Sequence, residues 1–150
     1  MRLPLPDGPV VGTDAMRALG TALAAVLGPG DVLCLRGDLG AGKTTLVQGL
    51  AAGLGIDPGL VASPTFALVH TYHGGDVPLV HLDLYRLESV GELQAAGLDD
   101  ALHDPEALVV VEWPDVAASA LPRHAQWLEI TLTGSSTTVG RWVRQATALR

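Results

Sequence analysis

Residues 37–44 have the sequence Gly37-Asp38-Leu39-Gly40-Ala41-Gly42-Lys43-Thr44, which matches the pattern G-x-x-x-x-G-K-[ST]. The apolar run at residues 32–35 predicts a buried strand before it, and apolar side chains at helical spacing predict a helix over residues 43–54. The composition of the chain gives roughly 0.001 to 0.002 chance matches to this pattern. We interpret these residues as a phosphate-binding loop; the alternative is a glycine-rich turn that only joins strand to helix.

Each residue type in this loop has a physical reason to be there. Glycines let backbone N–H groups turn towards phosphate oxygens, and the first turn of the following helix adds a positive potential. Lys43, the only lysine of the chain, can reach the terminal phosphates, and the Thr44 hydroxyl can bind Mg²⁺. The sequence therefore predicts nucleotide binding at residues 37–44.

Two carboxylates follow predicted strands. Asp83 comes directly after Val80-His81-Leu82, and Glu112 comes directly after the apolar run at residues 108–111. Because ligands of parallel sheets bind at the carboxyl ends of the strands, we expect both carboxylates near the phosphate-binding loop, where they can orient Mg²⁺ or water. The alternatives are an exposed strand face for Asp83 and a solvated strand end for Glu112.

Other polar and aromatic residues give weaker signals. Residues 63–65, Ser-Pro-Thr, lie where switch-like loops of phosphate-loop proteins often sense the terminal phosphate, although a Ser-Pro turn before a strand is the simpler interpretation. We expect His70, His73 and His81 to pack on strand faces and not to bind a metal. Trp113 is predicted to stack on a base or a partner, or to pack.

The remaining sequence predicts an alternation of helices and strands. An amphipathic helix follows Thr13-Asp14, which can cap its start, and stops at residues 28–30. The other predicted elements are a strand hairpin of residues 66–72 and 79–85, a helix at residues 88–96 ended by Gly97, a buried strand at residues 108–111, and a second hairpin of residues 127–132 and 139–146 around Gly134-Ser135-Ser136.

Size and composition restrict the class of protein. The chain has 150 residues, of which 48% are hydrophobic, and this favours one globular domain over residues 1–150. Cys34 is the only cysteine and cannot form an internal disulfide. The apolar stretches are shorter than the roughly 18 residues of a transmembrane helix. The first residues contain two prolines and an early aspartate instead of an apolar signal core, so we expect a cytoplasmic protein.

The charge distribution argues against a nucleic-acid groove. The formal net charge is −7, and the arginines are dispersed along the chain. Arg141, Arg144 and Arg150 come nearest to a cluster, and we expect them to be solvated surface residues. Tight direct binding of a nucleic acid is therefore not predicted.

Four stretches in the same order and with similar spacing resemble the TsaE family, whose members are bacterial ATPases required to make threonylcarbamoyladenosine in tRNA. They are residues 37–45, Ser63-Pro64-Thr65-Phe66, His81-Leu82-Asp83-Leu84-Tyr85-Arg86-Leu87 and Val111-Glu112-Trp113-Pro114. The resemblance runs from about residue 3 to residue 132, and the last two motifs are far more specific than the phosphate loop alone.

The resemblance implies a compact phosphate-loop NTPase fold of the α/β class. We expect a mainly parallel central sheet with antiparallel hairpins, helices on both faces, and a single ATPase domain over residues 1–150. The implied cofactors are ATP and Mg²⁺, and the implied partners are proteins like TsaB and TsaD, with ATP hydrolysis supporting repeated rounds of the reaction.

The resemblance also assigns roles by position. Lys43, Asp83 and Glu112 match catalytic residues, Thr44 and Glu112 match the Mg²⁺ ligands, and Asp83 matches the residue that positions water or the metal shell. Thr65 matches part of a switch-like loop. The matching nucleotide-binding residues are Asp38, Leu39, Gly40, Ala41, Gly42, Lys43, Thr44, Thr45 and Thr65. Tyr85, Arg86 and Trp113 match motif positions without an assigned role.

One position departs from the family pattern. Family members usually carry a threonine four residues before a glycine that matches Gly20, and this chain has Met16 there.

Two other functions compete with the ATPase prediction. One is a nucleotide-dependent binding switch with incidental turnover. The other is a small-molecule kinase, which normally needs an acceptor pocket and an arginine-bearing lid that we do not find in the sequence.

Overall fold

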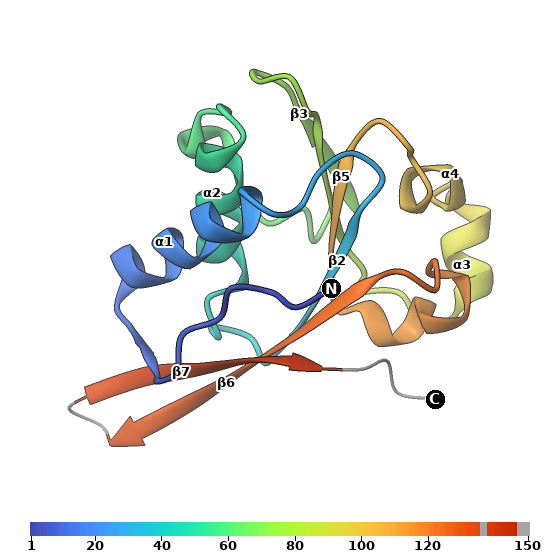
Figure 1. Cartoon of the computed structure of the whole chain (residues 1–150). Helices are drawn as coiled ribbons and strands as arrows, with labels where there is room; N and C mark the ends of the chain where they lie inside the picture. Colours follow the sequence, from blue (N-terminus) through green and yellow to red (C-terminus); the bar gives the residue numbers. More distant parts are fainter. Residues whose placement is uncertain (136–137, 147–150) are drawn as a thin grey trace.

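Seven strands form one mixed sheet in the computed structural model of the chain, which describes residues 1–135 and 138–146 (Figure 1). Their order is β1-β7-β6-β2-β5-β4-β3. The central strands β6, β2, β5 and β4 are parallel, and β7, β1 and β3 pair antiparallel at the two sides. The strands are β1 (Val10–Val11), β2 (Val32–Arg36), β3 (Val69–Tyr72), β4 (Leu79–Asp83), β5 (Leu108–Glu112), β6 (Gln126–Ser135) and β7 (Thr138–Ala146).

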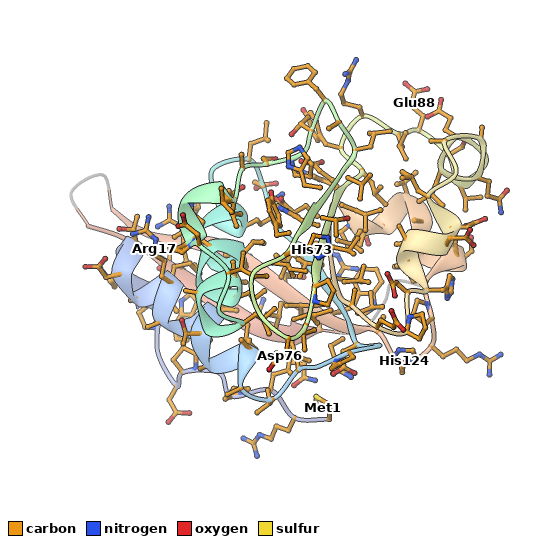
Figure 2. All side chains as sticks on the ribbon, turned by 90° about the horizontal axis from the view of Figure 1, so that it is seen from above. Met1, Arg17, His73, Asp76, Glu88 and His124 are labelled. Atoms are coloured by element: carbon orange, nitrogen blue, oxygen red, sulfur yellow. The ribbon has the colours of Figure 1, made fainter. Side chains whose placement is uncertain are left out.

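Helices cover both faces of this sheet. The helices α1 and α2 lie on one side and α3 and α4 on the other, as Figures 1 and 2 both show. The residues of β2 alternate between these two layers: Leu33 and Leu35 belong to the hydrophobic cluster of α1 and α2, and Val32 and Cys34 to the opposite one. The helices are α1 (Thr13–Ala24), α2 (Lys43–Gly53), α3 (Val90–Ala95) and α4 (Asp99–Leu102), with 3-10 helices at Pro58–Leu60 and Pro114–Ala120.

The structure confirms the predicted α/β class with a parallel central sheet and helices. It corrects some boundaries. Thr13 does not cap the first helix, because α1 begins at Thr13 and Gly12 occupies the cap position. The strand predicted from residue 66 begins only at Val69, because Leu68 has the left-handed backbone angle φ = 69°. The strand predicted to residue 85 ends at Asp83.

Most of the remaining differences between the predicted and the observed elements concern short elements. β1 and α4 were not predicted, since two and four residues are too few for a periodic pattern. The second hairpin is confirmed as β6 and β7. Of the predicted features, Ser136 of its turn and Arg150 of the arginine group lie outside the described residues.

No helix in the described ranges has both the length and the apolar character to cross a bilayer. The single domain over residues 1–150 and the cytoplasmic location stay predictions. Cys34 is buried and free, and burial, which is the largest cause, raises the pKa of its thiol to about 12. This thiol therefore stays protonated and unreactive in the folded protein.

Close contact between two helices fixes the position of α2. A Cβ atom on Gly20 of α1 would overlap the backbone of α2 at Leu46 and Leu50, and one on Gly49 would overlap the backbone of Arg17. Only glycine therefore allows the two helices to approach this closely. The first turn of α2 carries Lys43, so this contact also sets the position of the candidate site.

Gly20→Ala tests this contact. The added methyl group forces the helices apart, and we expect the free energy of unfolding to fall by about 1 to 3 kcal/mol, measured by urea denaturation. Gly28→Ala is the matched control, since a Cβ there meets no atom within 4 Å. Equal stability of the two variants would contradict the packing described.

Candidate functional site

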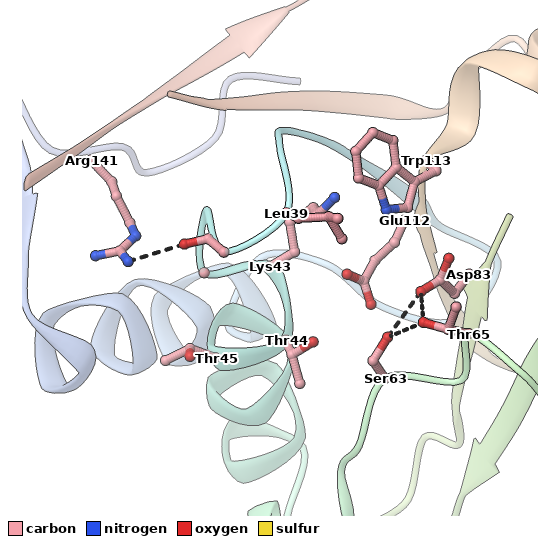
Figure 3. Close-up of a pocket in the computed structure, with 12 residues that line it drawn as sticks. Leu39, Lys43, Thr44, Thr45, Ser63, Thr65, Asp83, Glu112, Trp113 and Arg141 are labelled. Carbon is pink, nitrogen blue, oxygen red and sulfur yellow. Dashed lines mark hydrogen bonds between the residues drawn. The ribbon is translucent and has the colours of Figure 1, made fainter. Parts of the chain in front are cut away.

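A polar cavity of about 450 Å³ opens where residues 37–42 join β2 to α2 (Figure 3). Most residues predicted for the site lie on its wall. Asp38 and Ala41 do not: Asp38 lines a smaller neighbouring cavity, and Ala41 is buried in the core. The lining residues are Leu39, Gly40, Gly42, Lys43, Thr44, Thr45, Ser63, Thr65, Asp83, Glu112, Trp113 and Arg141.

The shape of the loop depends on its glycines. Gly40 and Gly42 have φ angles of +77° and +100°, which side chains rarely tolerate, and Gly42 is the N-cap of α2. No side chain caps this helix, so the N–H groups of its first turn remain able to bind an anion. Lys43, Thr44 and Thr45 occupy that turn.

Asp83 and Glu112 are neighbours across the parallel pair β4 and β5. Only 2% of Asp83 and 3% of Glu112 is exposed. The two alternative interpretations, an exposed strand face for Asp83 and a solvated strand end for Glu112, are therefore wrong. Both carboxylates lie at the carboxyl edge of the sheet, on the wall of the same cavity, as predicted.

Asp83 holds the segment that precedes β3. Its Oδ2 accepts hydrogen bonds from Ser63 Oγ at 2.9 Å and Thr65 Oγ1 at 2.8 Å (Figure 3). Its Oδ1 accepts one from the Tyr85 backbone N–H at 2.9 Å. The Ser-Pro-Thr segment is thus attached to the cavity wall through a carboxylate. A change in the hydrogen bonding of Asp83 would be transmitted directly to this segment.

Glu112 has a buried histidine as its partner. Nε2 of His81 hydrogen bonds to Oε2 of Glu112 at 2.5 Å, and His81 is fully buried. His81 was predicted only to pack on a strand face. Its bond to Glu112 was not predicted, because the sequence does not show the register of β4 against β5. His73 is exposed in the segment between β3 and β4 (Figure 2), and His70 bonds to the Tyr72 hydroxyl.

Lys43 extends along the loop towards Trp113. Its Nζ donates a hydrogen bond to the Gly37 carbonyl at 2.6 Å and lies 3.5 Å from the centroid of the Trp113 ring. Burial lowers the pKa of Lys43, while the negative charges of Glu112 and Asp83 oppose this shift. Trp113 has a left-handed backbone with φ = 55° and stacks at a tilt against Tyr85.

Arg141 was predicted to be a solvated surface residue, but it is only partly exposed and its Nε is buried. It lies on the cavity wall, and its guanidinium donates a hydrogen bond to the Gly40 carbonyl at 3.2 Å. Arg144 on the same strand is exposed and pairs with Glu129, as expected of a surface arginine. Met16 is buried, and its methyl group lies against Gly42.

The fold and the site define an α/β protein whose glycine-rich loop forms a polar cavity, together with two buried carboxylates, at the carboxyl edge of parallel strands. A family model described as "Threonylcarbamoyl adenosine biosynthesis protein TsaE" matches residues 11–143. The chain belongs to this TsaE family of tRNA threonylcarbamoyladenosine biosynthesis proteins, which confirms the resemblance seen in the sequence.

Individual relatives agree with this family. The chain is 41% identical over 124 residues to the tRNA threonylcarbamoyladenosine biosynthesis protein TsaE of Bacillus subtilis, covering 83% of this chain and 76% of that protein. The Streptomyces coelicolor protein of the same name is 50% identical over 101 residues, covering 65% and 66%. A crystal structure of Bacillus subtilis YdiB has a TM-score of 0.73 at 31% identity, covering 97% and 88% of the two chains.

Asp83→Asn tests the hydrogen bonds that hold residues 63–65. An amide replaces one of the two acceptor oxygens with a donor, so we expect the free energy of unfolding to fall by about 1 to 3 kcal/mol in urea denaturation. Asp14→Asn, at an exposed side chain, is the control and should leave stability unchanged. Unchanged stability in both variants would mean that Asp83 does not hold this segment.

Proposed function

We propose that this chain binds Mg²⁺ and ATP in the cavity and hydrolyses ATP as the ATPase subunit of the cytoplasmic machinery that makes threonylcarbamoyladenosine in tRNA. One observation carries the proposal: a single cavity brings together the glycine-rich loop, the Thr44 hydroxyl and the carboxylates of Asp83 and Glu112. These are the groups that a phosphate-loop hydrolase needs for the phosphates, the metal and the attacking water.

The phosphates fit the loop and the first turn of α2. Backbone N–H groups there supply donors, and Lys43 supplies a positive charge that can exchange the Gly37 carbonyl for a terminal phosphate oxygen. The residues proposed to surround the nucleotide are Leu39, Gly40, Gly42 and Thr45, which line the cavity, and Asp38 and Ala41, which belong to the loop but whose side chains lie outside the cavity.

The donor set also fits Mg²⁺. This ion is usually held by one or two carboxylates together with substrate phosphates and water, and Thr44 and Glu112 lie on the same cavity wall. We propose these two residues as its ligands. The bound ion would neutralise negative charge that develops on the phosphates.

The buried carboxylates have separate tasks in this proposal. His81 hydrogen bonds to one oxygen of Glu112 and so orients its carboxylate, which would leave the other oxygen free to hold the metal. Asp83 positions water or the metal shell, and it is held in place by Ser63 and Thr65. Its buried position restricts the directions in which it can accept a proton or a hydrogen bond.

The partners are proposed to be proteins like TsaB and TsaD. The net charge of −7 supports a protein partner over direct tRNA binding, because an acidic surface repels phosphates. The chain would then reach the tRNA reaction through that complex.

A nucleotide-dependent switch is a second candidate, and the contacts of Asp83 favour it. Thr65 and Ser63 are attached to the cavity through this one carboxylate, so a phosphate or a metal that competes for it would release them. In that case binding of ATP would drive the change, and hydrolysis would be incidental.

Glu112→Gln separates the two functions. ATP hydrolysis and threonylcarbamoyladenosine formation are measured for the purified chain, alone and with TsaB-like and TsaD-like proteins. We expect the partners to stimulate hydrolysis, and the variant to lose about 100-fold or more of it, together with repeated tRNA modification. Arg144→Gln is the control at an exposed arginine that does not line the cavity.

Two other outcomes of this experiment would contradict the ATPase proposal. Full tRNA modification by the variant without hydrolysis would establish the switch. No hydrolysis by the native chain under either condition would leave only the family membership.

Thr44→Ala tests the metal ligand. Removal of the hydroxyl should weaken ATP binding by about 10-fold in the presence of Mg²⁺ and have little effect in EDTA, as measured by isothermal titration calorimetry. An equal loss under both conditions would contradict the role of Thr44 as a ligand.

A further inference from the structure

Arg141 brings a positive charge from β7 to the glycine-rich loop. Antiparallel pairing places it opposite Leu132 of β6 and Val10 of β1, far along the chain from residues 37–44. Figure 3 shows its guanidinium beside the loop, at the opposite end of the cavity from Glu112 and Trp113. The cavity therefore carries a cation at each end of the loop, Lys43 and Arg141.

The charge of Arg141 has no acidic counterpart in the part of the chain that the structure describes. Among residues 1–135 and 138–146, its guanidinium donates one hydrogen bond, to the Gly40 carbonyl, and its buried Nε has no hydrogen-bond partner. A buried guanidinium nitrogen is normally paired, because desolvation of an unpaired charged group is costly. Arg144 shows the contrast, since Glu129 neutralises it at the surface.

The position of this arginine selects the part of a nucleotide that it can reach. Its Nε lies 3.1 Å from where a Cβ would stand on Gly42, the residue that caps α2. Asp83 and Glu112, at the other end, mark the proposed place of the terminal phosphate and the metal. The phosphates nearer the nucleoside would then extend along the first turn of α2 towards Arg141.

We propose that Arg141 is a nucleotide-binding residue that donates hydrogen bonds to the phosphates nearer the nucleoside, and that it exchanges the Gly40 carbonyl for them. This inference rests on the proposed nucleotide binding. Arginine suits the task because its planar donors form charge-assisted, often bidentate, bonds with phosphate oxygens. ADP and ATP share these phosphates, so both should depend on Arg141 to the same degree.

A simpler role for Arg141 is to hold the glycine-rich loop in place through its hydrogen bond to the Gly40 carbonyl. A neutral amide can still donate to the Gly40 carbonyl but carries no charge, so Arg141→Gln distinguishes the two roles. Arg144→Gln removes an arginine from the same strand outside the cavity and is the matched control. Thermal unfolding of each variant without nucleotide shows whether the fold is intact.

The experiment measures the dissociation constants of ADP and of ATP with Mg²⁺ by isothermal titration calorimetry at several salt concentrations. Arg141→Gln should weaken both nucleotides about 10- to 100-fold and reduce the salt dependence of binding. Arg144→Gln should bind both as the native chain does.

Three results would overturn the assignment. Native affinity in Arg141→Gln would mean that the arginine only holds the glycine-rich loop in place. A loss of affinity confined to ATP would place its contact on the terminal phosphate. An unchanged salt dependence despite weaker binding would mean that its charge does not act on the nucleotide. If the native chain binds neither nucleotide, the proposed function itself fails, which is a distinct result.

Discussion

The site depends on two buried carboxylates at one edge of the sheet, which need hydrogen-bond donors and a nearby cation. Asp83 and Glu112 are neighbours in the register of β4 and β5 and are almost fully buried. Two like charges removed from water together are unfavourable unless each receives hydrogen bonds and a cation lies nearby. The hydroxyls of Ser63 and Thr65, the ring of His81 and the ammonium of Lys43 meet these needs. The cavity is the place where these distant segments converge.

Much of this arrangement could be predicted because its signals are local. The glycine-rich loop lies between a short apolar run and a helical pattern. Glu112 directly follows an apolar run, and Asp83 follows the predicted strand residues Val80-His81-Leu82. Parallel pairing then brings Asp83 and Glu112 to the same edge as the loop. The confirmed α/β fold follows from the same alternation of patterns. Element ends were less accurate, since the left-handed Leu68 delays the start of β3 without any signal in the sequence.

The residues that sequence reasoning missed depend on contacts between distant segments. His81 reaches Glu112 only because β4 and β5 pair in one register, and no local pattern specifies that register. Arg141 and Gly40 are 101 positions apart in the sequence, and they meet because the second hairpin passes beside the loop. Its exposed neighbour Arg144 has the same character in the sequence, so composition alone could not separate the two.

The most direct test of this account is a crystal structure of the chain with Mg²⁺ and a non-hydrolysable ATP analogue. We predict that the phosphates lie along residues 37–44, that Mg²⁺ contacts the Thr44 hydroxyl, and that the terminal phosphate faces Asp83 and Glu112. A nucleotide bound outside this cavity, or a metal ion held without Thr44 and Glu112, would contradict it.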